Sequence, residues 1–118
     1  MQIDTGRAKP YELEITRHTV PITGLPPGLN GAVAVHLSDF HAGFGNTAPV
    51  LERVVELVDE ICPHYLFLTG DYLDDAKHSS GFAIGDLIGR LHARIGAYGS
   101  LGNHDHRRGP EGTIRMLQ

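Results

Sequence analysis

The fold is decided by residues 32–71, which read AVAVHLSDFHAGFGNTAPVLERVVELVDEICPHYLFLTGD. The first eight residues, 32–39, begin with an uninterrupted apolar run, which is typical of a strand covered on both faces of a sheet. Apolar side chains then recur at helical spacing over 47–61, with Pro49 in the first turn. A second apolar run at 64–71 predicts another buried strand. Strand, helix and strand in this order predict a parallel β-α-β unit with a right-handed crossover.

The segments on either side extend this unit. Residues 11–22 alternate between apolar and polar side chains, which predicts a strand, and Pro21 favours a position at the sheet edge. A turn-rich connector follows at 23–31. Downstream, a weaker helical pattern at 80–93 precedes a third strand at 95–103. The sequence therefore predicts an α/β fold in which an N-terminal edge strand precedes a β-α-β-α-β core.

Composition narrows the class of protein. The 118 residues fit one domain or a piece of one, and a net charge of −4 gives no reason to expect a nucleic-acid surface. Cys62 is the single cysteine, which excludes an internal disulfide and favours a reducing compartment. The sequence has no apolar run of 18 residues and no apolar N-terminal stretch typical of a signal peptide. These features favour a cytoplasmic location.

Polar side chains follow each of the three core strands at the point where the strand ends. The clusters read SDFH at 38–41, TGDYLDD at 69–75 and LGNHDH at 101–106. Because the carboxyl ends of parallel strands meet at one edge of a sheet, where ligands usually bind, we expect these clusters to converge. Carboxylate, amide and imidazole groups together suit Mn, Fe or Zn. The sequence therefore predicts a metal site at this edge.

Each cluster contains a chemically specific arrangement. In Asp39-Phe40-His41 the two outer side chains lie on the same side of an extended chain, so they can bind one cation. Asp71 follows Gly70, a residue type that permits a sharp turn and a close backbone approach, and its two oxygens can bridge two cations. Asn103 offers a neutral oxygen ligand. Any one of these patterns also occurs in ordinary turns, so their common order at strand ends is the informative observation.

The three motifs resemble those of the calcineurin-like metallophosphoesterase family, which run D-x-H, then G-D-x-x-D, then G-N-H-[D/E]. They stand here at 39–41, 70–74 and 102–105, with 32 residues from Asp39 to Asp71 and 32 from Asp71 to Asn103. The resemblance implies an α/β/β/α sandwich of two sheets flanked by helices. This chain would supply its parallel-sheet half.

The resemblance also implies a site and a reaction. The family hydrolyses phosphomonoester, phosphodiester or pyrophosphate bonds with two divalent metal ions. In this reaction an activated water attacks phosphorus in line. The implied metal ligands are Asp39 and His41 for the first ion, Asp71 as the bridge and Asn103 for the second ion. The implied catalytic residues are His104, which stabilises or protonates the departing oxygen, and Asp74, which orients it.

The family pattern continues with a further histidine and a G-H-x-H element, and neither occurs in this chain. We therefore expect residues 1–118 to be the N-terminal portion of a single phosphoesterase domain, with an edge strand and connector at 1–30 and the metal-site half at 31–118. On this expectation the isolated chain lacks the C-terminal histidine ligands needed for activity. An alternative is a non-catalytic short form or fragment that binds one metal ion or a partner chain.

The stretches EITRHTVPITGLPPGLNG (14–31) and VHLSDFHAG (35–43) are similar to a bacterial branch of the family. That branch is often membrane-associated and includes phosphodiesterases that act on lipid-linked or nucleotide-type pyrophosphates. The resemblance implies a phosphorylated small-molecule or lipid-linked substrate. It leaves open peripheral membrane association of the full-length protein and self-association of this chain.

Five of the eight histidines lie outside the three strand-end clusters. His18, His64, His78 and His92 lie outside the strand-end clusters, where surface or edge positions are expected. His36 lies inside a predicted strand, where we expect it to be hydrogen-bonded. A nucleotide-binding α/β domain is the least supported alternative, because neither G-x-x-x-x-G-K nor G-x-G-x-x-G follows a strand.

Overall fold

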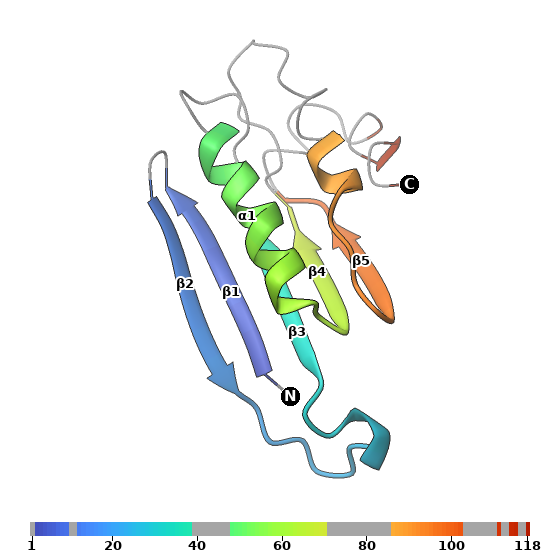
Figure 1. The fold of residues 1–118 in the computed structure, drawn as a ribbon. Helices are drawn as coiled ribbons and strands as arrows, with labels where there is room; N and C mark the ends of the chain where they lie inside the picture. Colours follow the sequence, from blue (N-terminus) through green and yellow to red (C-terminus); the bar gives the residue numbers. More distant parts are fainter. Residues whose placement is uncertain are drawn as a thin grey trace.

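The sheet is the centre of the computed structural model, which describes residues 2–9, 12–38, 48–70, 86–102, 111, 114, 115 and 118. Five strands hydrogen-bond in the order β2-β1-β3-β4-β5, and helix α1 lies across one face of the sheet (Figure 1). The elements are β1 (Gln2–Lys9), β2 (Glu12–Thr19), the short 3-10 helix η1 (Pro27–Leu29), β3 (Val33–Ser38), α1 (Ala48–Ile61), β4 (Tyr65–Thr69) and β5 (Gly96–Ser100).

The predicted α/β class is confirmed. Strands β3, β4 and β5 pair in parallel, and α1 connects the first two of them. The elements β2, β3, α1, β4 and β5 each lie inside the range expected for them, and the bounds of these four strands lie one to three residues inside the expected ones at each end. The predicted edge position of the segment at 11–22 is also confirmed, because β2 is the outermost strand on its side.

Strand β1 has no counterpart in the sequence prediction. It lies between β2 and β3, antiparallel to the first and parallel to the second. Its sequence, QIDTGRAK, contains only two apolar side chains, one large and one small, which is too few for an alternating pattern. It also contains Gly6, and a glycine weakens a strand locally. The strand forms because both neighbours pair with its backbone, as Gly6 does with Ile15 on one side and Leu37 on the other.

The hydrophobic core lies between α1 and the sheet. Apolar residues at helical spacing on α1 meet the alternate residues of β3 and β4 that point towards the helix, and all of them are buried. The members from these three elements are Leu51, Val54, Val55, Val58, Val35, Leu37, Leu66 and Leu68. Leu87 and Leu91 complete the cluster from the chain segment before β5.

The opposite face of the sheet is less buried. Tyr65, Phe67 and Tyr98 form a stacked aromatic row there, with ring centroids 6.3 Å apart for the first pair and 5.8 Å apart for the second. Phe67 is 37% exposed and Tyr98 is 57% exposed. The prediction that these strands are covered on both faces is therefore not met within the described residues, because α1 packs on one face alone.

The second predicted helix ends earlier than expected. Residues 86–89 are helical, and 80–85 lie outside the described part of the chain. The predicted end at residue 93 is wrong. Arg90 and Leu91 instead donate backbone hydrogen bonds of 3.0 Å to the carbonyls three residues earlier, as in a tightened last turn, and this directs Leu91 into the core.

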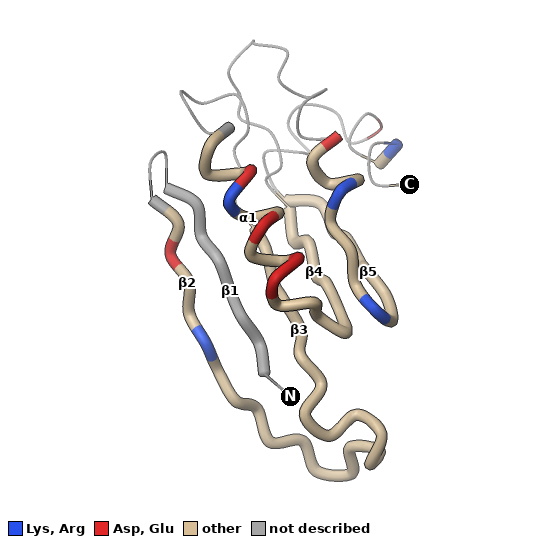
Figure 2. Tube along the Cα trace, in the orientation of Figure 1, with Lys and Arg blue, Asp and Glu red and all other residues tan. Residues whose placement is uncertain are grey.

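Charge is distributed unevenly over these elements. The charged residues coloured in Figure 2 lie on α1, on β2, in the segment before β5 and, as Glu111 and Arg115, near the C-terminus, whereas the sequences of β3, β4 and β5 contain no Lys, Arg, Asp or Glu. On α1, the Arg53 guanidinium lies 2.9 Å from the Glu56 carboxylate and 3.4 Å from that of Glu60. The three parallel strands thus contribute no Lys, Arg, Asp or Glu that could balance the carboxylates predicted at their carboxyl ends.

Candidate functional site

The candidate site is defined by the strand ends that lead into it. The predicted metal ligands and catalytic residues all lie outside the described residues: Asp39, His41, Asp71, Asp74, Asn103 and His104. The structure does describe the residue that directly precedes the first predicted metal ligand of each motif. These are Ser38 at the end of β3, Gly70 after β4 and Gly102 after β5.

The three strand ends lie side by side at one edge of the sheet. Strand β4 lies between β3 and β5, and all three run in the same direction. Leu37 is opposite Leu68 near the end of the first pair, and Thr69 is opposite Ser100 at the end of the second. The predicted convergence of the strand ends is confirmed, and in Figure 1 the arrowheads of β4 and β5 point to this edge.

Gly70 and Gly102 bring two of the motifs into direct backbone contact. Gly70 is buried and has a φ of +95°, a left-handed conformation that favours glycine. A Cβ built on Gly70 would lie 2.5 Å from Cα of Gly102 and 2.8 Å from the carbonyl carbon of Leu101, and it would also overlap the backbone nitrogen of Gly102. The space that a side chain at position 70 would need is therefore occupied by the backbone of Leu101 and Gly102, which leads into Asn103.

A side-chain hydrogen bond joins β3 to β4 just below this contact. Nε2 of His36 lies 2.5 Å from Oγ1 of Thr69, on the face of the sheet away from α1. The expectation that His36 is hydrogen-bonded is confirmed. Sequence reasoning did not single out Thr69, although its place two residues before Asp71 in a strand-end cluster was a signal.

His64 has a structural part at the opposite edge, where the parallel strands begin. The ring Nδ1 of His64 accepts a hydrogen bond of 3.0 Å from the backbone N–H of Val33. The backbone N–H of His64 donates a hydrogen bond of 2.8 Å to the Val33 carbonyl. The His64 carbonyl accepts a further bond of 2.8 Å from the N–H of Ile95. His64 thus joins the starts of β3, β4 and β5, which an expected surface or edge histidine need not do.

One ion pair links α1 to the chain that leads into β5. The guanidinium of Arg90 donates a hydrogen bond of 2.8 Å to the Glu52 carboxylate. This bond lowers the pKa of Glu52 and raises that of Arg90. Both side chains are about half exposed, so the pair is screened by solvent and salt.

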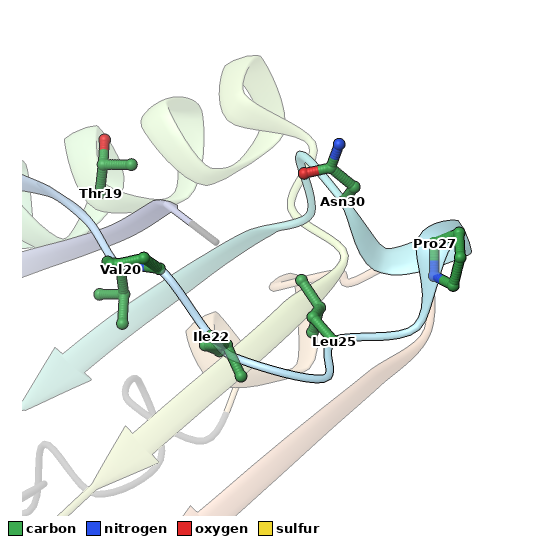
Figure 3. A pocket seen from close by; sticks show the side chains of 7 residues that line it. Thr19, Val20, Ile22, Leu25, Pro27 and Asn30 are labelled. Atoms are coloured by element: carbon green, nitrogen blue, oxygen red, sulfur yellow. The ribbon is translucent and has the colours of Figure 1, made fainter.

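A pocket at the far end of the molecule does not belong to the site. It has a volume of about 500 Å³ and is lined by the connector between β2 and β3, including Ile22, Leu25 and Asn30 (Figure 3). Its lining contains no ionisable side chain and therefore offers no side-chain acid or base for catalysis. Among the residues that the structure describes, no three His, Cys, Asp or Glu side chains gather as a metal site.

In the described ranges, no helix has both the length and the apolar character required to cross a bilayer.

Known proteins match this chain over most of its length. The model of the family described as calcineurin-like phosphoesterase matches residues 33–117, which include all three motifs. A transmembrane protein with metallophosphoesterase domain from Danio rerio is 36% identical over 87 residues, covering 74% of this chain and 20% of the relative. No solved structure shows a significant match.

Two bacterial relatives are similar over a longer stretch. The uncharacterized metallophosphoesterase YkuE of Bacillus subtilis is 31% identical, covering 83% of this chain and 35% of the relative. The UDP-2,3-diacylglucosamine pyrophosphatase LpxG of Chlamydia trachomatis is 29% identical, covering 83% of this chain and 30% of the relative. The chain thus spans about a fifth to a third of the length of these relatives. By the family match and these similarities, the chain belongs to the calcineurin-like phosphoesterase family.

Proposed function

We propose that this chain contributes Asp39, His41, Asp71 and Asn103 to a two-metal site that hydrolyses phosphoester bonds. The observation that carries the proposal is the contact between Gly70 and Gly102 at the common edge of β3, β4 and β5. Because the backbones of Gly70 and Gly102 are in contact, the chain segments that lead into Asp71 and Asn103 begin next to each other. A bridging carboxylate and a neutral amide ligand can then serve neighbouring cations.

The donor set fits divalent transition metals. Two carboxylates, one imidazole and one amide oxygen offer the mixed ligands that Mn, Fe and Zn accept. Strands without charged residues lie beneath the site, so the carboxylates of Asp39 and Asp71 would repel each other unless cations balanced them. Bound divalent ions would supply activation of water near neutral pH and neutralisation of the phosphoryl oxygens.

Two further side chains complete the proposal. His104 follows Asn103 in the sequence, and neighbouring side chains of an extended segment point to different sides, so His104 is proposed to face the substrate while Asn103 faces the metal. In the proposed reaction the His104 imidazole donates a proton to the departing oxygen. The Asp74 carboxylate accepts a hydrogen bond from the other ring nitrogen and fixes the orientation of the imidazole.

The proposed substrate is a phosphodiester or pyrophosphate on a lipid-linked or nucleotide-type molecule, with phosphomonoesters as the alternative. The name of LpxG describes a pyrophosphatase of UDP-2,3-diacylglucosamine, and the Danio rerio relative is named a transmembrane protein. Both names favour a full-length protein that works at a membrane surface.

The test compares two matched substitutions in the full-length protein. Asp71→Asn removes the proposed bridging charge, whereas Asp59→Asn makes the same change on the exposed face of α1. Hydrolysis of p-nitrophenyl phosphate and of bis(p-nitrophenyl) phosphate is measured with Mn²⁺ added. We expect Asp71→Asn to lower kcat/KM by at least about a hundredfold and Asp59→Asn to leave it unchanged.

The outcome of this comparison also separates the rival reading. Unchanged hydrolysis in Asp71→Asn contradicts the proposal. Calorimetry that finds a single weak Mn²⁺ site, together with no hydrolysis of either ester, supports a non-catalytic metal-binding protein instead.

A further inference from the structure

We infer that His36 and Thr69 form a positioning pair that fixes the ends of β3 and β4, the strands that lead into Asp39 and Asp71. The inference rests on the proposed function, since it concerns the same site. It starts from the 2.5 Å hydrogen bond between Nε2 of His36 and Oγ1 of Thr69. Neither residue is a proposed metal ligand.

The position of the bond relative to the backbone pairing is the first step. The register of β3 with β4 runs from Ala34 opposite Tyr65 to Leu37 opposite Leu68. Thr69 lies one residue beyond that register, so the His36 side chain reaches past the end of the paired segment. The hydrogen bond therefore ties the last residue of β4 to β3 directly before the chain turns at Gly70.

The connection from Thr69 to the third strand is the second step. The Thr69 backbone is opposite Ser100 of β5, while its side chain bonds to His36 of β3. One residue thus links all three strands that lead into the motifs. His36 precedes Asp39 by three residues, Thr69 precedes Asp71 by two, and Ser100 precedes Asn103 by three.

The chemistry of the pair is the third step. The core uses the other face of these strands, where Leu37 and Leu68 are 6% and 5% exposed. His36 is half-buried and Thr69 is exposed on the face away from α1, so packing alone does not require either polar group. A hydrogen bond at an exposed position contributes little to the free energy of unfolding. Its value at this place is geometric, because metal ligands must be held to within roughly 0.5 Å.

The test removes the hydroxyl and keeps the shape. Thr69→Val deletes the Oγ1 partner of His36, and Thr69→Ser retains it. Thr19→Val is the matched control, since Thr19 is an exposed strand residue at the opposite edge of the sheet, opposite Gln2. Mn²⁺ affinity, kcat and KM are measured in the full-length protein, and thermal unfolding is measured for each variant.

We expect Thr69→Val to weaken Mn²⁺ binding by about tenfold or more and to lower kcat with little change in KM, as loss of a supporting hydrogen bond does at metal sites. Thr69→Ser should restore both values, and the melting temperature of Thr69→Val should equal that of Thr19→Val. Equal Mn²⁺ affinity in Thr69→Val and Thr19→Val overturns the inference.

Amide hydrogen exchange separates this inference from the proposed function. In protein without metal, Thr69→Val should speed exchange at the ends of β3 and β4, near Leu37 and Leu68, and not at their starts near Ala34 and Tyr65. If the unsubstituted protein binds no Mn²⁺, the proposed function fails, and the exchange pattern still decides whether the pair holds the strand ends. An exchange pattern identical in Thr69→Val and Thr19→Val overturns the positioning role in either case.

Discussion

Gly70 and Gly102 approach so closely that no side-chain carbon fits between their backbones. The contact joins the end of β4 to the segment after β5, which belong to different motifs in the sequence. Two glycine-containing motifs that are separate in the sequence therefore pack against each other through their backbones.

Gly70→Ala should destabilise the chain by about 2–4 kcal/mol. The left-handed φ of +95° is strained for alanine, and the new Cβ collides with backbone atoms that cannot rotate away. Urea unfolding measures the change. Gly28→Ala is the control, because a Cβ there meets nothing within 4 Å, and it should alter stability by less than about 0.5 kcal/mol. Equal stability of the two variants would show that the contact is not present in solution.

Leu66→Ala should lower the free energy of unfolding by about 2–5 kcal/mol. Leu66 is 1% exposed and lies under α1, so truncation leaves a cavity in the core. The control is Ile22→Ala in the connector, where the side chain is 45% exposed and the expected loss is well under about 1 kcal/mol. Chemical denaturation with both circular dichroism and tyrosine fluorescence would reveal the difference.

His64→Ala should cost about 1–3 kcal/mol. The substitution leaves the Val33 amide without its 3.0 Å acceptor at the edge where three parallel strands begin. His92→Ala changes an exposed histidine and should be nearly neutral. Hydrogen exchange of the Val33 amide is the direct measurement, and protection that survives in His64→Ala would contradict the assignment.

The Glu52–Arg90 pair predicts a small pH dependence of stability. The pKa of Glu52 is lowered from its ordinary value of 4.5 in the folded chain, so its contribution is present above that value and is lost as the pH falls through the lower folded pKa. Thermal unfolding between pH 3 and pH 7 should therefore show a slightly smaller acid-dependent decrease in Glu52→Gln than in the unsubstituted chain. In roughly 1 M salt the two profiles should coincide, because exposed pairs are screened. A difference that persists in high salt would refute the electrostatic cause.

Metal removal should abolish hydrolysis by the full-length protein without unfolding it. The core between α1 and the sheet contains none of the proposed ligands, so secondary structure should survive chelation by EDTA. Activity should fall below about a tenth and return when Mn²⁺ is added. Full activity after exhaustive chelation would contradict the metal requirement.

The order of elements could be read from the sequence where local pattern and tertiary environment agree. The apolar run of β3 and the helical spacing on α1 each specify one structure, and the chain adopts it. The convergence of the three strand ends followed from parallel pairing alone. That inference required no knowledge of side-chain positions, which is why it survives although the ligands themselves remain predictions.

Other features depend on partners far away in the sequence. Strand β1 has almost no apolar pattern and exists because β2 and β3 pair with it. The helix that includes residues 86–89 ends before the predicted residue 93, and Leu91 after it is buried in the core cluster, a tertiary contact that the local pattern does not encode. The bond between His36 and Thr69 joins residues 33 positions apart, and no local pattern encodes such a pair.

The aromatic row on the open face of the sheet also gives the protein a spectroscopic reporter. The chain has no tryptophan and four tyrosines, two of which, Tyr65 and Tyr98, flank Phe67 in the row. Tyrosine emission and near-ultraviolet circular dichroism will therefore respond strongly to this surface. Binding of a polypeptide or a lipid over this surface can therefore be followed by these two signals, without a label and without a substitution.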